Sequence, residues 1–328
     1  MKALVTGGAG FIGSHLVELL LERGYAVTVV DNLSTGRTQN MQGFMDQIKF
    51  IEADLSKPSD AWTDEVANSD YVYHLASLAD IVPSIENPIE YFQSNVTSTA
   101  NLLACCNAKT LKKFVYAASS SCYGLAKKYP TSEEEPISPE YPYALTKRMG
   151  EELVLHWNKV YGLKVASTRF FNVYGTRSRT SGTYGAVFGI FLAQKLAGAP
   201  LTIVGDGKQT RDFTYVSDIC NGLLLAGESD FSCEVFNLAS GKPQSINYLA
   251  RLIGGEVTHI PKRPGEPDMT NADITKAKEM LGYKPTISFE EGVKKVLLDI
   301  EYWREAPVWT PEAIADATKV WFNSLGSN

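Results

Sequence analysis

A tyrosine and a lysine stand four residues apart at the start of a segment with helical periodicity. Tyr143 and Lys147 belong to the run PYALTK, and this spacing places both side chains on one face of a helix. A free tyrosine is a weak base at neutral pH, because its pKa is about 10. A nearby ammonium group favours the phenolate and lowers that pKa, so the pair is suited to removing a proton from a hydroxyl.

A run of hydroxyl side chains follows a predicted buried strand. In AASSSCYG (117–124), Ser119, Ser120 and Ser121 come at the end of the strand expected at Lys113–Ala118. Open parallel sheets bind ligands at the carboxyl ends of their strands, so these hydroxyls are expected in a ligand cleft. We therefore predict that Ser119 hydrogen-bonds the hydroxyl from which the tyrosine removes a proton.

A glycine-rich turn between the first predicted strand and the first predicted helix indicates a phosphate-containing cofactor. In TGGAGFIG (6–13), the first glycine of the pattern permits a tight turn, the second a close approach of a pyrophosphate, and the third close helix–sheet packing. The helix N-terminus then directs its free N–H groups at the phosphates. The cofactor-binding residues predicted here are Gly7, Gly10, Phe11, Ile12 and Gly13.

An acidic residue at the end of the second predicted strand favours NAD as the cofactor. Asp31 can accept hydrogen bonds from both hydroxyls of the adenosine ribose and would repel a 2′-phosphate. Arg37 lies close enough in sequence to keep NADP as an alternative. Asp54 and Leu55 are expected beside the adenine, and an ordinary helix N-cap is the alternative for Asp54. The predicted cofactor site also includes Asn32, Leu75 and Ala76.

Short apolar runs alternate with longer stretches of helical period, as in successive βαβ units. The strands are predicted at Lys2–Thr6, Val27–Val30, Lys49–Ala53, Tyr71–Leu75, Lys113–Ala118 and Lys164–Arg169. The main helices are predicted at Phe11–Arg23, Ile89–Ala108 and Tyr143–Tyr161. This order predicts an α/β fold with a Rossmann-type doubly wound parallel sheet.

After about residue 170, glycine and proline become frequent and the pattern loosens. We therefore predict a smaller, less regular C-terminal substrate lobe. The predicted cofactor domain covers 1–170 and returns at about 213–245, and the substrate lobe covers 171–212 and 246–328.

Composition excludes several classes of protein. The chain has 328 residues, 44% of them hydrophobic, which is enough for two lobes with a large core. The net charge of −6 argues against a general binder of nucleic acid. No apolar run reaches the length of a membrane span, and no secretory signal is recognisable. Five cysteines without zinc-like pairing predict no metal site and a reducing cytoplasm.

Taken together, the motifs resemble those of a known family. TGGAGFIG, Asp31, HLAS (74–77), SSSCYG, YALTK, RFFNVYG (169–175) and RDFTYV (211–216) occur in the order found in extended short-chain dehydrogenases/reductases. The chain looks most similar to the nucleotide-sugar 4-epimerase branch, and the resemblance covers residues 1 to about 300. It implies NAD as cofactor and a homodimer that packs through the helices predicted at Ile89–Ala108 and Tyr143–Tyr161.

The resemblance also implies roles for individual residues. Ser119, Tyr143 and Lys147 would form the catalytic triad. The substrate-binding residues would be Ser119, Ser120, Ser121, Tyr143, Asn172, Val187, Arg211, Arg263, Glu266 and Thr270. Among these, Asn172, Arg211 and Arg263 would contact the UDP portion, and Glu266 would hold the uridine ribose. Two arginines suit a pyrophosphate, because guanidinium groups match phosphate oxygens.

The reaction implied is 4-epimerisation of a UDP-hexose through a transient 4-keto sugar. The 4,6-dehydratases of the family carry an Asp–Glu pair where this chain has Ser120 and Ser121, and the decarboxylases carry a glutamate in this segment. Cys122 is offset by one residue from the place where 3,5-epimerases use a cysteine, and it is expected to be buried. A UDP-glucuronate 4-epimerase or decarboxylase, a 4,6-dehydratase and a non-catalytic NAD-binding regulatory module remain as alternatives.

Two positions bear on the sugar. Relatives that act on UDP-glucuronate tend to have threonine where Asn172 stands, so Asn172 favours a neutral hexose. Thr270 falls where a bulky tyrosine narrows the pocket of epimerases restricted to UDP-glucose and UDP-galactose. The predicted substrates are therefore UDP-GlcNAc/UDP-GalNAc, UDP-Glc/UDP-Gal, or both pairs.

Two segments depart from the family pattern. Pro83 precedes Ser84 where relatives often carry an arginine, so no substrate contact is assigned to the segment 78–88. The residues from Trp303 onward run past the point where many relatives end. Thr310 and Pro311 begin a predicted helix over 310–325 whose apolar stripe is expected to pack on the lobe rather than recruit a partner. The members of this stripe are Ile314, Ala317, Val320, Trp321 and Leu325.

Overall fold

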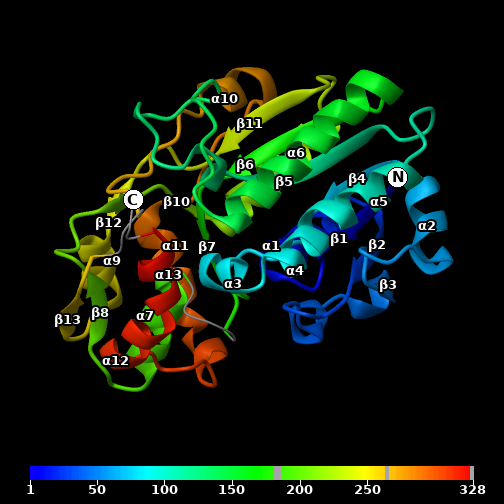
Figure 1. The fold of residues 1–328 in the computed structure, drawn as a ribbon. Helices are drawn as coiled ribbons and strands as arrows, with labels where there is room; N and C mark the ends of the chain where they lie inside the picture. The colour runs from blue at the N-terminus through cyan, green and yellow to red at the C-terminus, as the bar shows by residue number, and fades with distance from the viewer. Residues whose placement is uncertain (181–185, 263–265, 326–328) are drawn as a thin grey trace.

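Seven parallel strands form the central sheet of the protein, in the order β11-β6-β5-β4-β1-β2-β3 (Figure 1). The structure is a computed structural model that describes residues 1–180, 186–262 and 266–325. The strands are β1 (Lys2–Thr6), β2 (Ala26–Asp31), β3 (Ile48–Glu52), β4 (Tyr71–His74), β5 (Lys113–Ser119), β6 (Val165–Phe170) and β11 (Glu234–Leu238). The chain reverses its direction of winding at β1, which pairs with β2 on one side and β4 on the other. The predicted doubly wound parallel sheet is confirmed.

Alternate residues of the strands face two apolar cores on opposite sides of the sheet. In β1, Ala3 and Val5 belong to one core and Leu4 to the other. In β5, Val115 and Phe114 divide in the same way. The first core is covered by α1 (Phe11–Glu22) and α8 (Val216–Glu228), and the second by α2 (Asp60–Ala67), α5 (Ser98–Cys105) and α6 (Pro142–Tyr161). Burial on both faces explains why these strands are almost continuously apolar.

The second half of the chain is built from shorter elements. Its strand pairs are β7 (Asn172–Tyr174) with β10 (Phe213–Tyr215), β8 (Leu201–Val204) with β13 (Val257–Ile260), and β9 (Thr210–Arg211) with β12 (Gln244–Ser245). Its helices include α7 (Val187–Leu196), α9 (Ile246–Ile253), α10 (Thr275–Leu281) and α11 (Phe289–Leu298). Stacked and edge-on rings of Tyr174, Phe188, Phe213 and Phe289 pack together inside it. The expected smaller, less regular lobe is present, whereas the bounds of the two domains stay a prediction.

The helix predicted over Ile89–Ala108 contains a π-helical turn that the sequence does not predict. Helical backbone runs without a break from α4 (Pro88–Phe92) through η3 (Gln93–Thr97) into α5, and it ends at Cys105. The side chain of Asn95 in that turn is 1% exposed. It bonds the backbone of Leu78 and the hydroxyl of Thr146, and so fixes the turn between two neighbouring segments.

The C-terminal segment forms two short helices instead of the single predicted one. These are α12 (Pro311–Ala317) and α13 (Lys319–Leu325), which follow the 3-10 turn η5 (Ile300–Trp303). The hydroxyl of Thr318, at the break, is buried and bonds the carbonyl oxygen of Ile314 at 2.7 Å. The predicted apolar stripe nevertheless faces inward, since Ile314 and Trp321 are 2% and 6% exposed. Within the described residues, no helix has both the length and the apolar character that a membrane span requires.

Candidate active site

A cavity of about 840 Å³ lies at the carboxyl ends of the sheet strands and is closed on its other side by the smaller lobe. Every predicted site residue that the structure describes lines it. The lining residues on the cofactor side are Gly7, Gly10, Phe11, Ile12, Gly13, Asp31, Asn32, Asp54, Leu55, Leu75 and Ala76. Those on the substrate side are Ser119, Ser120, Ser121, Tyr143, Lys147, Asn172, Val187, Arg211, Glu266 and Thr270. The predicted Arg263 lies outside the described residues.

The glycine turn has the geometry that a dinucleotide requires. Gly7 has φ +71°, a conformation that strongly favours glycine. A side chain at Gly13 would meet the carbonyl oxygen of Gly7 at 2.1 Å, so only glycine lets the turn close on the start of α1. Gly10 caps α1 in an extended conformation and leaves the helix N-terminus facing the cavity. These features fit the pyrophosphate of a bound NAD.

Asp31 at the end of β2 is anchored as a hydrogen-bond acceptor. Its carboxylate accepts the backbone N–H groups of Ala9 at 3.0 Å and Leu33 at 2.8 Å. Burial raises the pKa of Asp31, and these two bonds oppose that shift. A carboxylate has about four acceptor positions, so further positions can receive ribose hydroxyls. Arg37, which kept NADP open, has its guanidinium 5.8 Å from the centre of the Tyr302 ring.

A buried histidine stabilises the end of β1, where the glycine turn begins. His74, at the end of β4, lies between the hydroxyls of Thr6 at 2.7 Å and Thr99 at 2.9 Å. Burial, helped by the charge of Lys147, lowers the pKa of His74 to about 3. The neutral ring therefore bonds the hydroxyl of Thr6 at the end of β1. That hydroxyl also accepts the backbone N–H groups of Leu75 and Ala76, which follow β4. Sequence analysis quoted this histidine in a motif but gave it no role.

The serine segment and the tyrosine meet in the cavity. Ser119, the last residue of β5, accepts hydrogen bonds from the backbone N–H of Ser121 at 3.2 Å and from its hydroxyl at 2.8 Å. Burial raises the pKa of Tyr143, and hydrogen bonds with Ser119 and Ser121 oppose that shift. The phenol of the tyrosine is thus placed beside two hydroxyls at the end of the strand, as the sequence predicts.

Lys147 lies one helical turn beyond Tyr143 and is 4% exposed. Its ammonium stands 4.5 Å from the centre of the Tyr116 ring. Burial lowers the pKa of Lys147 to about 7, and the charge of Glu151 opposes that shift. A lysine with such a pKa can hold a hydroxyl-bearing ligand and stabilise a neighbouring phenolate near neutral pH.

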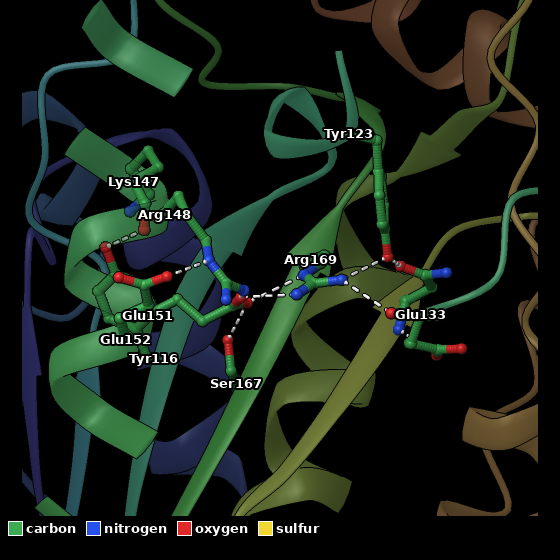
Figure 2. A network of polar contacts seen from close by, with 10 residues as sticks. Tyr116, Tyr123, Glu133, Lys147, Arg148, Glu151, Glu152, Ser167 and Arg169 are labelled. Carbon is green, nitrogen blue, oxygen red and sulfur yellow. Dashed lines mark hydrogen bonds and ion pairs between the residues drawn. The ribbon is translucent and has the colours of Figure 1, made fainter. Parts of the chain in front are cut away.

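A buried ion-pair network fixes the helix that carries the tyrosine and the lysine (Figure 2). Glu151 on α6 accepts both Arg169 Nε at 3.0 Å and Arg169 Nη2 at 2.6 Å, and also the hydroxyl of Ser167 at 2.8 Å. Arg169 Nη1 then donates to the hydroxyl of Tyr123 at 2.8 Å. Tyr123 follows Ser121 with only Cys122 between them. The network therefore links α6, strand β6 and the serine segment into one rigid unit.

The other end of the cavity carries the residues predicted for the nucleotide. Arg211 Nη2 lies 2.8 Å from Glu266 Oε1, so the guanidinium and the carboxylate are held together there. Thr270 donates its hydroxyl to Asn172 Oδ1 at 2.8 Å and accepts the backbone N–H of Asp212 at 3.0 Å. The first bond leaves the amide nitrogen of Asn172 as the group that can donate to a ligand.

Two features of the cavity escape sequence analysis. Asp80 and Arg179 both line it and form an ion pair with each other, although 99 positions separate them in the chain. The charge of Asp80 raises the pKa of Tyr143. No local pattern announces such a contact. The C-terminal residues Tyr302, Ala306, Pro307, Trp309 and Trp321 also line the cavity.

Cys122 is not an acid–base group of the cavity. The residue is 2% exposed and belongs to the apolar core, as expected. Burial raises the pKa of Cys122 to about 12, so its thiol stays protonated at neutral pH.

Comparison with known proteins agrees with this site. The profile of the NAD dependent epimerase/dehydratase family matches residues 3–239. A putative UDP-glucose 4-epimerase of Methanocaldococcus jannaschii is 38% identical over 304 residues, 90% of this chain and 96% of the relative. UDP-glucuronic acid decarboxylase 1 of Xenopus tropicalis is 36% identical over 317 residues, 93% of this chain and 72% of the relative. The crystal structure of a UDP-glucose 4-epimerase from Thermotoga maritima, with UDP-glucose, matches with a TM-score of 0.83 and 36% identity, covering 93% of this chain and 99% of that one.

Fold, glycine turn and Tyr–Lys pair define a nucleotide-cofactor enzyme of the short-chain dehydrogenase type. The chain belongs to the NAD-dependent epimerase/dehydratase family. The predictions of an enzyme and of NAD as its cofactor are confirmed. The alternative of a non-catalytic regulatory module is set aside.

Proposed function

We propose that the enzyme interconverts the C4 epimers of a UDP-hexose through a 4-keto sugar. The observation that carries this proposal is that Tyr143, Ser119, Ser121 and the buried Lys147 line one cavity at the carboxyl ends of the strands. Ser119 would orient the 4-hydroxyl, and Tyr143 would take its proton and later return it. Lys147 would stabilise the phenolate and hold the nicotinamide ribose. When bound, NAD supplies the reversible hydride transfer at C4.

The nucleotide end of the cavity would act as a tether during this reaction. Arg211 would bind the pyrophosphate and Glu266 the uridine ribose, after their mutual contact at 2.8 Å opens to the ligand. The keto sugar can then turn about this fixed end and present its opposite face. Arg263 is proposed for the same pyrophosphate on the basis of sequence alone.

Residues next to the triad favour epimerisation over the alternatives. Dehydration and decarboxylation need additional acid–base groups, whereas Ser120 and Ser121 supply only hydroxyls where the dehydratases of the family have a carboxylate pair. Asp80, a carboxylate that does line the cavity, is paired with Arg179. Epimerisation requires only the triad and the cofactor.

The small side chain of Thr270 supports a broad choice of sugar. Its hydroxyl donates a hydrogen bond of 2.8 Å to Asn172, and its side chain leaves more space in the cavity than a tyrosine would. We therefore propose UDP-GlcNAc/UDP-GalNAc as substrates, with UDP-Glc/UDP-Gal as the second pair. UDP-glucuronate is the competing substrate, and Asn172 weighs against it.

The experiment is to incubate the protein and NAD separately with UDP-GlcNAc, UDP-glucose and UDP-glucuronate, and to identify products by chromatography and proton NMR. We expect a 4-epimer of unchanged mass. Tyr143→Phe should lower the rate by roughly 10²- to 10⁴-fold. Tyr161→Phe, on the exposed end of the same helix, should leave the rate unchanged. A product lighter by water or carbon dioxide would overturn the proposal.

We further propose a homodimer in the cytoplasm. Apolar side chains are exposed on the two helices predicted for the interface, namely Ile89 and Phe92 on α4 and Leu145 and Val160 on α6. Burying them against a second copy would remove their apolar surface from water. Sedimentation velocity checks the assembly, and a monomer at micromolar concentration would contradict it.

A further inference from the structure

The C-terminal segment from Ile300 to Leu325, called the tail below, forms part of the cavity wall. Five of its residues line the cavity, as described above. The tail leaves α11, packs its first turn η5 against α7, and ends with α13 against α3 (Ile81–Glu86) (Figure 1). It therefore crosses from the smaller lobe to an element of the sheet side.

The wall contributed by α13 lies against α3, which in turn packs against the helix of Tyr143 and Lys147. Helix α3 begins directly after Asp80, whose charge acts on Tyr143, and its residues Ile81 and Val82 line the cavity. The same helix packs against α6, which carries Tyr143 and Lys147. Trp321 on α13 also lines the cavity and is 6% exposed, although it lies near the end of the chain.

Contacts on both sides hold the tail in place. Trp303 is fully buried, and Gln194 of α7 donates to the carbonyl oxygen of Trp309 at 2.7 Å. On the sheet side, the hydroxyl of Tyr302 donates to Asn40 Oδ1 at 2.7 Å. The amide of Asn40 in turn donates to the carbonyl oxygen of Ala9 in the glycine turn at 2.9 Å. The tail is thus joined to the cofactor loop as well as to the substrate lobe.

Part of this chain has no counterpart in the Thermotoga maritima enzyme. The structural match includes 99% of the Thermotoga maritima chain but only 93% of this chain. This chain therefore has residues without a counterpart there. The sequence analysis locates such an excess after Trp303. A tail that fills part of the cavity lining is therefore a place where this enzyme can differ from its relatives.

We propose that Trp321 is a positioning residue that retains the oxidised sugar at the catalytic end. This inference rests on the proposed 4-epimerisation. There, the C4–H and O–H bonds of the sugar are broken, and the 4-keto sugar must turn while only its nucleotide is tethered. A wall that excludes water and blocks the way out keeps the ketone bound until C4 is reduced again. The indole ring is a large rigid surface for that purpose.

The test compares Trp321→Ala and Trp321→Phe with Phe322→Ala, which changes an adjacent residue of the same helix that is 37% exposed. The first readout is free 4-keto sugar per turnover, trapped by borodeuteride reduction in the filtrate. The second is the affinity for UDP-glucose and for UDP, measured by calorimetry in the inactive Tyr143→Phe background. Because the wall lies at the sugar end, only the sugar-bearing ligand should respond.

We expect Trp321→Ala to increase the amount of keto sugar released per turnover by at least about tenfold. It should lower the affinity for UDP-glucose by a similar factor and leave the affinity for UDP unchanged. Trp321→Phe should give values of release and affinity between those of Trp321→Ala and the unaltered enzyme. Phe322→Ala should give the values of the unaltered enzyme. Unchanged keto-sugar release, or an equal loss of affinity for UDP and UDP-glucose, would overturn the inference. If the unaltered enzyme makes no epimer, the proposed function fails, and the two affinities still decide the role of Trp321.

Discussion

Two regions hold the catalytic end of the cavity, and they do so by different means. On one side of it, Glu151 of α6 and Arg169 of β6 are buried and joined by a bidentate ion pair between the helix and the central sheet (Figure 2). Beside it, the tail is fixed mainly by apolar anchors such as Ile314 and Trp321 on two short helices. Tyr143 and Lys147, the proposed proton-transfer groups, are thus held by elements that belong to the core of the fold. The wall is held by a segment at the edge of the fold, so we expect it to tolerate change more readily than they do.

Breaking the buried ion pair should have the largest effect. Arg169→Leu leaves the buried carboxylate of Glu151 with only the partly exposed Arg148 as an ionic partner, at 2.6 Å, and we expect the free energy of unfolding to fall by about 3 kcal/mol. Urea denaturation measures it. The matched change Arg304→Leu removes an exposed arginine paired with Glu301 in the tail, and it should cost less than about 1 kcal/mol. Equal losses in both variants would show that the network is no more important than a surface pair.

Shortening an apolar anchor of the tail should affect the tail alone. Ile314→Ala removes a side chain that is 2% exposed, and we expect the local opening free energy of α12 and α13 to fall by about 2 kcal/mol. Hydrogen exchange of the backbone amides measures this locally. Val308→Ala, at a position 43% exposed, is the control. Faster exchange throughout the sheet would contradict the distinction between the two regions.

Removing the buried ammonium should stabilise the protein in the absence of cofactor. Because burial lowers the folded pKa of Lys147 to about 7, the unfolded chain binds more protons between that pH and its ordinary pKa of about 10.5. Burying the charged ammonium therefore lowers the free energy of unfolding by the full amount below pH 7, and by progressively less as the pH rises above 7. Lys147→Met should raise the free energy of unfolding by at least about 1.4 kcal/mol at pH 6.5, which is the value of one pKa unit. Near pH 10.5 it should raise it by almost nothing. Thermal denaturation across pH checks this, and a pH-independent gain would refute it.

The smallest effect is expected from the ion pair at the cavity wall. The charge of Asp80 raises the pKa of Tyr143, so Asp80→Asn should lower that pKa. If Tyr143 acts as a base, the acidic limb of the kcat/KM profile should then move to lower pH by less than about one unit. Glu86→Gln removes the same charge from the exposed end of α3 and should leave the profile in place. A shift to higher pH would exclude the assigned electrostatic role.

The parts of the fold that sequence predicted are those governed by local rules. Strand periodicity, the glycine turn and the spacing of Tyr143 and Lys147 depend on neighbours within a few residues, and the sheet and the cavity lining followed from them. The π-helical turn at Asn95 was missed because the partner of Asn95, Thr146, lies 51 positions away and is set by tertiary packing. The break at Thr318 was missed although its hydroxyl bonds Ile314 locally, because threonine also occurs inside helices. The Asp80–Arg179 pair joins distant parts of the chain and leaves no local trace.

The position of α13 has a practical consequence for handling the enzyme. This helix ends at Leu325, and its Trp321 lines the cavity. An affinity tag or fluorescent fusion attached after this helix would therefore be joined to a segment of the cavity wall. Met1, by contrast, is exposed and precedes β1 at the opposite edge of the strands (Figure 1). Labels, surface tethers and fusion partners belong on the N-terminus of this protein.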